Sequence, residues 1–194
     1  MKLLVAALLA GFILVLSGCG GQAEKPVFKL TDVTGASFGK TLELTDHNGQ
    51  RRTLTDFRGK VVALFFGFTH CPDVCPTTLV EMASVMKELG PDAERVQVLF
   101  VSVDPERDTA DVLKRYVPAF HPTFLGLTGS ADEIARAAKE FKIFYQKQNL
   151  SGGGYTMDHS AGTYILDGEG RLRLFAQYGA GAPALLNDIR QLLK

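Results

Sequence analysis

Two long apolar runs constrain the fold of this chain more than any other feature. Residues 61–68 read VVALFFGF and residues 96–103 read VQVLFVSV. Both largely lack the alternating polar positions of a strand with one solvated face. Runs of this kind are typical of central strands that are covered on both faces by helices. The chain is therefore expected to form an α/β fold around two buried strands.

Helical patterns follow both runs. After Pro76, the sequence TTLVEMASVMKELG places four apolar side chains on one helical face, and Gly90-Pro91 ends the helix. These side chains are Leu79, Met82, Met86 and Leu89, so we interpret both methionines as core residues rather than metal ligands. Residues 109–116 predict a second helix, a capping box at Ser130 and Glu133 predicts a third through residue 141, and an apolar stripe over 185–193 predicts a closing helix.

The remaining strand signals suggest a mixed sheet. Residues 41–44 and 51–54 flank Asn48-Gly49 and predict an N-terminal β-hairpin. Residues 143–146, 162–166 and 171–177 also read as strands. The order predicts a three-layer α/β sandwich with a mixed central sheet. It resembles a thioredoxin-like fold with an N-terminal hairpin extension, formed by residues 28–194.

The first residues have a different pattern from this domain. Lys2 is followed by an apolar or glycine run over residues 3–16, which is shorter than the roughly 20 residues of a membrane-spanning helix. The string LSGC at residues 16–19 resembles the lipobox of bacterial lipoproteins. We expect residues 1–18 to be a lipoprotein signal peptide, Cys19 to be lipidated and residues 19–27 to form a tether. An ordinary signal peptide and an uncleaved anchor are the alternatives.

This pattern predicts an exported protein that a lipid anchor attaches to a bacterial membrane, on its periplasmic or outer face. The sequence leaves inner and outer membrane open. The chain has 21 basic and 21 acidic residues. Such a balance argues against a nucleic-acid partner, because that binding requires many phosphates to be neutralised.

The string THCPDVCP at residues 69–76 is the strongest chemical signal. It places Cys71 and Cys75 at the start of the predicted helix, with Pro76 in the first helical position and Cys75 at or next to the N-cap. Free N–H groups there stabilise a thiolate, so we expect lowered thiol pKa values. The pair could form a stapling disulfide, exchange disulfides or bind a metal. Thioredoxin-like oxidoreductases usually have two residues between their cysteines, whereas this chain has three.

A metal site needs a further ligand, and the chain has four histidines. His47 in the hairpin turn and His121 in a Phe-His-Pro loop are interpreted as surface residues. His70 follows the first central strand directly and is interpreted as a supporting or structural residue. His159 lies in a polar loop over residues 155–162, which a thioredoxin-like layout would pack beside the two cysteines. The role of Met157 in the same loop stays open.

Three strings carry a resemblance to a known family. GFTHCPDVCP at residues 67–76, VSVDPERDT at 101–109 and YTMDHSAGTYILD at 155–167 resemble the Sco/SenC family of copper chaperones. The resemblance implies copper bound by Cys71, Cys75 and His159. It also implies a role in assembling the binuclear copper centre of cytochrome c oxidase subunit II. That subunit or another cuproprotein is then the expected partner.

The chemistry of these residues agrees with copper. Two thiolates and one neutral imidazole suit three-coordinate Cu(I), and an added ligand could also hold Cu(II). Asp158 is a candidate for orienting His159, and Asp104 resembles a family feature near the site. Two functions remain open. One is a metallochaperone, and the other is a thiol-disulfide oxidoreductase that uses Cys71 and Cys75 to reduce a recipient's cysteines. Only the first requires His159.

Overall fold

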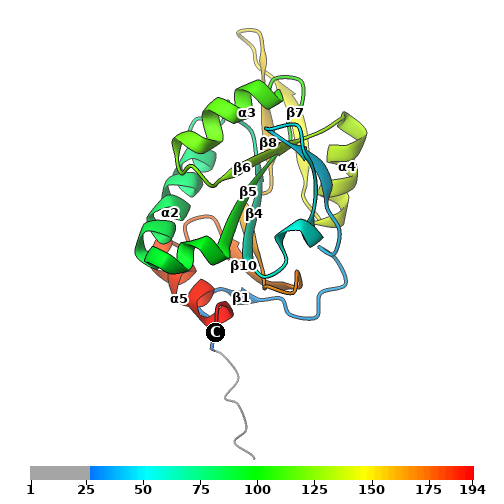
Figure 1. Cartoon of the computed structure of the whole chain (residues 1–194). Coiled ribbons are helices and arrows are strands. Elements are labelled where there is room, and N and C mark those ends of the chain that lie inside the picture. Colours follow the sequence, from blue (N-terminus) through cyan, green and yellow to red (C-terminus); the bar gives the residue numbers. More distant parts are fainter. Residues whose placement is uncertain (1–26) are drawn as a thin grey trace, which may run out of the picture.

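The computed structural model describes residues 27–194, which form one eight-stranded sheet with flanking helices (Figure 1). The predicted signal peptide and Cys19 lie outside the described residues. The strand order in the sheet is β1-β10-β9-β4-β5-β6-β2-β3. Its strands are β1 (Thr31–Asp32), β2 (Glu43–Asp46), β3 (Arg51–Thr53), β4 (Val61–Gly67), β5 (Val96–Ser102), β6 (Leu125–Thr128), β9 (Gly162–Leu166) and β10 (Leu172–Gln177). Over residues 27–194, no helix is both long enough and apolar enough to cross a bilayer.

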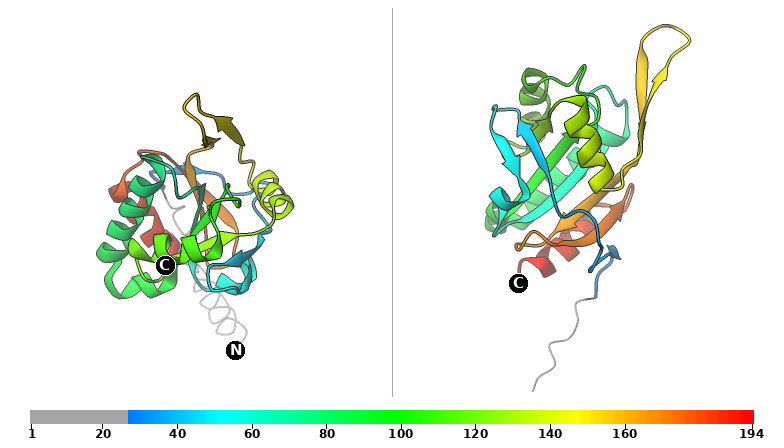
Figure 2. Two further views of the ribbon diagram at one scale, coloured as in Figure 1. Left: turned by 90° about the horizontal axis from the view of Figure 1, so that it is seen from above. Right: turned by 90° about the vertical axis from the view of Figure 1, so that its right-hand side faces the viewer.

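The helices form a layer on each face of the sheet (Figure 2). On one face lie α2 (Val74–Leu89), α3 (Ala110–Tyr116) and α5 (Ala182–Leu192), and on the other lies α4 (Ala131–Glu140). Phe65 of β4 packs against Phe100, which packs against Tyr116 of α3. Phe66 points to the opposite face and packs against Phe141, just after α4. Short 3-10 segments are Leu54–Phe57, Gly90–Arg95 and Val117–Ala119.

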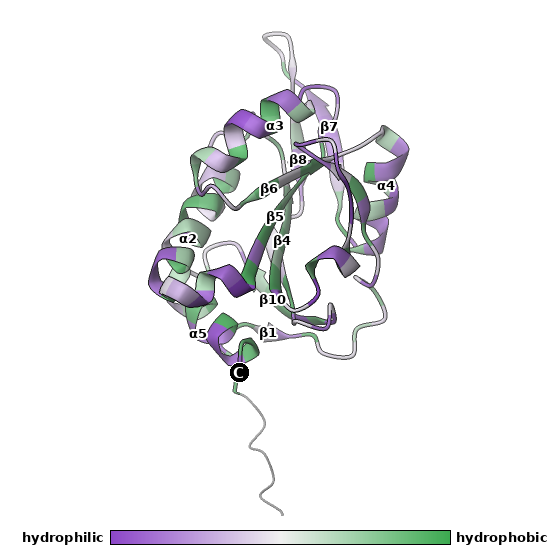
Figure 3. Cartoon of the chain, viewed as in Figure 1, coloured by the Kyte–Doolittle hydropathy of each residue, from purple (hydrophilic) through white to green (hydrophobic). Residues whose placement is uncertain are grey.

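The two apolar runs form the centre of the sheet, as predicted. Every residue of β4 and β5 is buried, and the strands pair in parallel from Val61↔Val96 to Gly67↔Ser102. In Figure 3 the ribbon of these central strands is coloured mainly hydrophobic, whereas much of α4 is coloured hydrophilic. The other neighbour of β4 is β9, which is antiparallel, so the sheet is mixed. This arrangement confirms the thioredoxin-like sandwich.

The predicted N-terminal hairpin is also present. Strands β2 and β3 pair antiparallel, and β2 pairs with β6 to extend the sheet. The capping box at Ser130 and Glu133 begins α4 as expected. Three strands were not predicted: β1, β6 and β8 (Tyr155–His159).

The prediction of a loop over residues 155–162 was wrong for its first five residues. They form β8, which pairs with β7 (Tyr145–Asn149) in a separate two-stranded hairpin (Figure 2). Burial alternates along this strand: Met157 is buried and the next residue, Asp158, is exposed. The sequence shows the same alternation of apolar and polar residues, and this pattern could have predicted the strand.

The interpretation of His47 as a surface residue was also wrong. Only 7% of His47 is exposed. The imidazole Nδ1 of His47 accepts a hydrogen bond from the backbone N–H of Gly126 at 3.1 Å. The backbone N–H of His47 donates to Gly126 O at 2.9 Å. The pairing of β2 with β6 holds the turn against the sheet, which buries this ring. His121 is half-buried, and its Nδ1 lies 2.9 Å from Thr123 Oγ1.

Candidate metal centre

Three chain segments meet at one edge of the sheet. Strand β4 ends at Gly67 and leads into the loop with Cys71, while α2 carries Cys75 in its first turn. His159 ends β8, just before β9 begins at Gly162. Because β9 is antiparallel to β4, its first residue lies at the edge where β4 ends. This edge is also where sites form in open α/β sheets.

The structure brings Cys71, Cys75 and His159 together. Their ligand atoms all lie within 4.8 Å of one another, and both thiols are free. The Cys75 Sγ is 3.6 Å from His159 Nε2. Of the predicted site residues, these three form the cluster, and Asp104, Asp158 and His70 do not belong to it.

The start of α2 differs from the prediction. The helix begins at Val74 with Asp73 as N-cap, so Cys75 is its second residue rather than its cap. Cys75 is fully buried, whereas Cys71 is partly exposed. Burial raises the pKa of the Cys75 thiol, and the nearby Cys71 raises it further. The expectation of a lowered pKa was therefore wrong for Cys75, because the loss of solvent outweighs the lowering effect of the hydrogen bond from the Phe68 backbone.

Gly67 makes room for the buried sulfur. A Cβ at this position would lie 2.6 Å from Cys75 Sγ and 3.0 Å from Phe100 Cε2. No side chain fits at those distances without a shift of its neighbours. The last residue of β4 is therefore glycine for a steric reason that concerns the site directly.

A backbone carbonyl orients His159. Its Nδ1 lies 3.0 Å from Ser160 O, and because a carbonyl can only accept, Nδ1 carries the proton. The lone pair of Nε2 therefore faces Cys75. Burial lowers the pKa of His159, and this effect exceeds the opposing one of the Ser160 carbonyl. The edge of the imidazole also meets the Phe68 ring, with centroids 5.8 Å apart.

Asp158 was predicted to orient His159, and the structure contradicts this. The Asp158 side chain is exposed, and the hydrogen-bond acceptor at Nδ1 is Ser160 O. Successive residues of a strand point to opposite faces, so Asp158 points away from the face that carries His159.

Asp108 supports the cysteine loop, a role that was not predicted from the sequence. This fully buried carboxylate accepts hydrogen bonds from Thr69 N at 3.0 Å, Thr69 Oγ1 at 2.6 Å and Ser102 Oγ at 2.6 Å. It thereby joins the segment before Cys71 to the end of β5. The available signal was an acidic residue shortly after a buried strand, in the same string as Asp104.

Asp104 acts on the hairpin rather than on the three ligand atoms. It accepts hydrogen bonds from Tyr155 Oη at 2.9 Å and from Arg107 Nε. Arg107 Nη1 donates to Tyr155 O at 2.9 Å, and its guanidinium lies 3.7 Å from the centre of the Tyr155 ring. Asp104 and Arg107 therefore hold the start of β8, the strand that ends at His159.

A groove of about 460 Å³ opens beside the cluster. We call it the outer groove, and its lining includes Cys71, Met157 and His159 together with the exposed ring of Phe144. The other lining residues are Phe68, Pro72, Val74, Thr156, Asp158, Ser160 and Ala161. His70 is exposed, with Nδ1 3.2 Å from Thr69 Oγ1.

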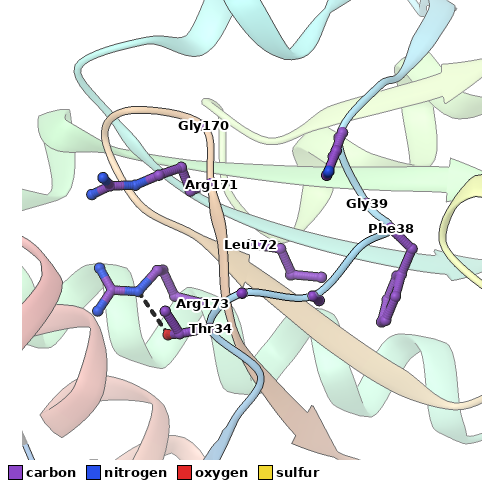
Figure 4. Close-up of a pocket in the computed structure, with 10 residues that line it drawn as sticks. Thr34, Phe38, Gly39, Gly170, Arg171, Leu172 and Arg173 are labelled. Carbon is purple, nitrogen blue, oxygen red and sulfur yellow. Dashed lines mark hydrogen bonds between the residues drawn. The ribbon is translucent and has the colours of Figure 1, made fainter.

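A larger cavity of about 690 Å³ lies against β10 and has no soft ligands (Figure 4). Phe38, Leu172, Arg171 and Arg173 are among its lining residues. Both arginines form ion pairs with Asp167, and Arg173 Nε also donates to Thr34 Oγ1 at 2.9 Å. Because these cations are already paired, the cavity offers no unpaired arginine to an anion.

The cluster itself can support two kinds of chemistry. Two sulfurs and one imidazole nitrogen form a donor set for a soft metal ion. Two adjacent free thiols can also be oxidised to a disulfide.

Comparisons with known proteins identify the family to which this chain is related. The SCO1/SenC family matches residues 31–194. The mouse mitochondrial SCO2 homologue is 40% identical over 151 residues, which cover 76% of this chain and 59% of the mouse protein. The chain thus spans less than two thirds of that protein's length.

Solved structures give the same result. Apo Sco1 from Thermus thermophilus is 44% identical, with a TM-score of 0.77 over 86% of this chain and 98% of that one. Copper-bound ScoI from Bradyrhizobium japonicum is 39% identical, with a TM-score of 0.75 over 81% of this chain and all of that one. The extent of the family match and these identities together show that the chain belongs to the SCO1/SenC family.

Proposed function

We propose that this protein is a copper metallochaperone that binds its cargo through Cys71, Cys75 and His159. The observation that carries the proposal is the convergence of the three ligand atoms within 4.8 Å, with the His159 Nε2 lone pair aimed at Cys75. Copper in the Bradyrhizobium japonicum relative supports the choice of metal. The donor set independently favours Cu(I), since thiolates are soft ligands.

Copper on these ligands would be held strongly and still be transferable. Two thiolates and a neutral imidazole around Cu(I) form a three-coordinate complex with one net negative charge. A fourth ligand could adapt the same site to Cu(II). The outer groove gives a recipient's ligands access to Cys71 and His159, so transfer proceeds by ligand exchange. The proposed recipient is the binuclear copper centre of cytochrome c oxidase subunit II or a similar cuproprotein.

A second candidate function is reduction of the recipient's cysteines. The observation in its favour is that Cys71 and Cys75 are both free and close together. In this reaction Cys71 and Cys75 would form a disulfide, and the recipient's disulfide would become two thiols, so two electrons and two protons pass to the recipient. His159 has no necessary role in this exchange.

We also propose an organisation for the whole chain. Residues 1–18 are a lipoprotein signal peptide, Cys19 is the lipidated residue and residues 19–27 are a tether to the copper-binding domain of residues 28–194. The sequence pattern at residues 16–19 supports this arrangement. The protein then works at a bacterial membrane, on the periplasmic or outer face.

Anaerobic loading of the reduced protein with one equivalent of Cu(I) tests the metallochaperone function. His159→Ala should lower the Cu(I) affinity by about tenfold or more while the Cys71–Cys75 disulfide still forms. His121→Ala is the matched control, since this half-buried histidine is not in the cluster. A wild-type protein that holds no copper would refute the function. Equal affinity without His159 would refute the ligand assignment.

A further inference from the structure

The outer groove reaches two of the three proposed ligands but not the third. Cys71 and His159 line it, whereas Cys75 does not line it and is fully buried. Copper bound to all three ligands therefore sits at the inner end of this groove. A copper ion that moves outward must leave the Cys75 sulfur before it leaves the other two.

Besides Cys71, Met157 is the other sulfur-containing residue among those that line the outer groove. It lies two residues before His159 on β8, so both side chains point to the same face of the strand. Their Cα atoms are separated by about 7 Å, the repeat of two strand residues. Met157 is 9% exposed and lines the groove with Cys71 and His159. Its thioether is a soft, uncharged donor on a flexible side chain.

We propose that Met157, Cys71 and His159 form an outer copper position through which Cu(I) passes between the inner site and a recipient. This inference rests on the proposed function and assigns a residue to the transfer route. As Cu(I) moves outward, the bond to Met157 Sδ forms and the bond to Cys75 Sγ breaks. The metal keeps three ligands throughout the exchange.

The step balances without a redox partner. Copper remains Cu(I), and no electron is transferred. The thiolate of Cys75 takes up one proton from water when copper leaves it. One thiolate and two neutral donors then surround Cu(I), so the complex becomes neutral. A neutral complex in an open groove is held less strongly than the charged inner complex, which suits an ion about to be passed on.

Transfer kinetics test the role of Met157. Protein loaded with one Cu(I) is mixed rapidly with an excess of a coloured Cu(I) chelator, and the transfer rate is measured. Met157→Leu keeps the size and apolar character of the side chain but removes the sulfur. It should slow transfer by about tenfold, with a much smaller effect on equilibrium affinity. Met82→Leu is the matched control, because Met82 is fully buried on α2, and it should transfer at the wild-type rate.

A trapped complex tests the position itself. Cys75→Ser removes the inner sulfur, so its Cu(I) should occupy the outer position. In selenomethionine-labelled Cys75→Ser protein, X-ray absorption should show a copper–selenium contact that disappears on adding Met157→Leu. The inference is overturned if transfer from Met157→Leu matches wild type, if no selenium contact is seen, or if Cys75→Ser holds no Cu(I). Failure of wild type to bind copper would instead refute the proposed function.

Discussion

Substitution of Gly67 by alanine tests whether the end of β4 shapes the site. The added Cβ would lie 2.6 Å from Cys75 Sγ, and ordinary contact begins at 3.4 Å. The sulfur or the backbone must therefore move by about 0.8 Å, the difference between these two distances. Both groups are buried between β4 and α2, so neither can move without disturbing the core.

The expected cost has two parts. Overpacking of a core costs about 1–3 kcal/mol, and the reduced freedom of the unfolded chain on replacing glycine returns about 0.4–1 kcal/mol. We expect a net loss of about 1–2 kcal/mol in the free energy of unfolding. Metal–ligand distances tolerate only about 0.2 Å, so Cu(I) affinity should fall by at least about tenfold.

Urea unfolding of the apo protein and competition for Cu(I) with a chelator measure these effects. Gly152→Ala is the matched control, because a Cβ there meets nothing within 4 Å and its backbone is outside the left-handed region. If Gly67→Ala matched Gly152→Ala in both stability and affinity, the steric account of Gly67 would be refuted.

Three further substitutions address the surroundings of the site and the fold. Asp108→Asn should lower the free energy of unfolding by about 2–3 kcal/mol, because an amide cannot accept all three hydrogen bonds. Thermal unfolding measures this loss, and an unchanged midpoint would contradict the prediction. Tyr155→Phe removes the hydroxyl that donates to Asp104 but keeps the ring beside Arg107, so we expect a loss of about 1 kcal/mol and a smaller fall in Cu(I) affinity than His159→Ala causes. Burial lowers the pKa of His47, so the folded state binds fewer protons there than the unfolded state, and stability should fall as pH drops below about 6.5. His47→Asn should lose less stability between pH 7.5 and 5.5 than wild type in urea unfolding, and equal losses would show that His47 does not contribute.

The sequence predicted what depends on local pattern. The run over residues 61–68 gave β4 because its apolar side chains leave no solvated face, and the Cys71–Cys75 spacing indicated the site directly. His47 and Asp108 were misjudged or missed for a different reason. His47 is buried against Gly126 of β6, which lies 79 residues further along the chain. Asp108 holds Thr69, which lies 39 residues earlier in the chain. The raised pKa of Cys75 likewise follows from packing that no helix-start pattern contains.

The unequal burial of the two cysteines would give a direction to the reactions with another protein that we propose. Cys75 has no exposed surface, whereas Cys71 borders the outer groove. An incoming sulfur or disulfide can therefore make its first bond only at Cys71. In the proposed reactions Cys75 would then act second, from within the protein, to resolve a mixed disulfide or to bind the incoming metal. Two cysteines that look equivalent in the sequence would thus act in a fixed order, one as the point of contact and the other as the internal partner.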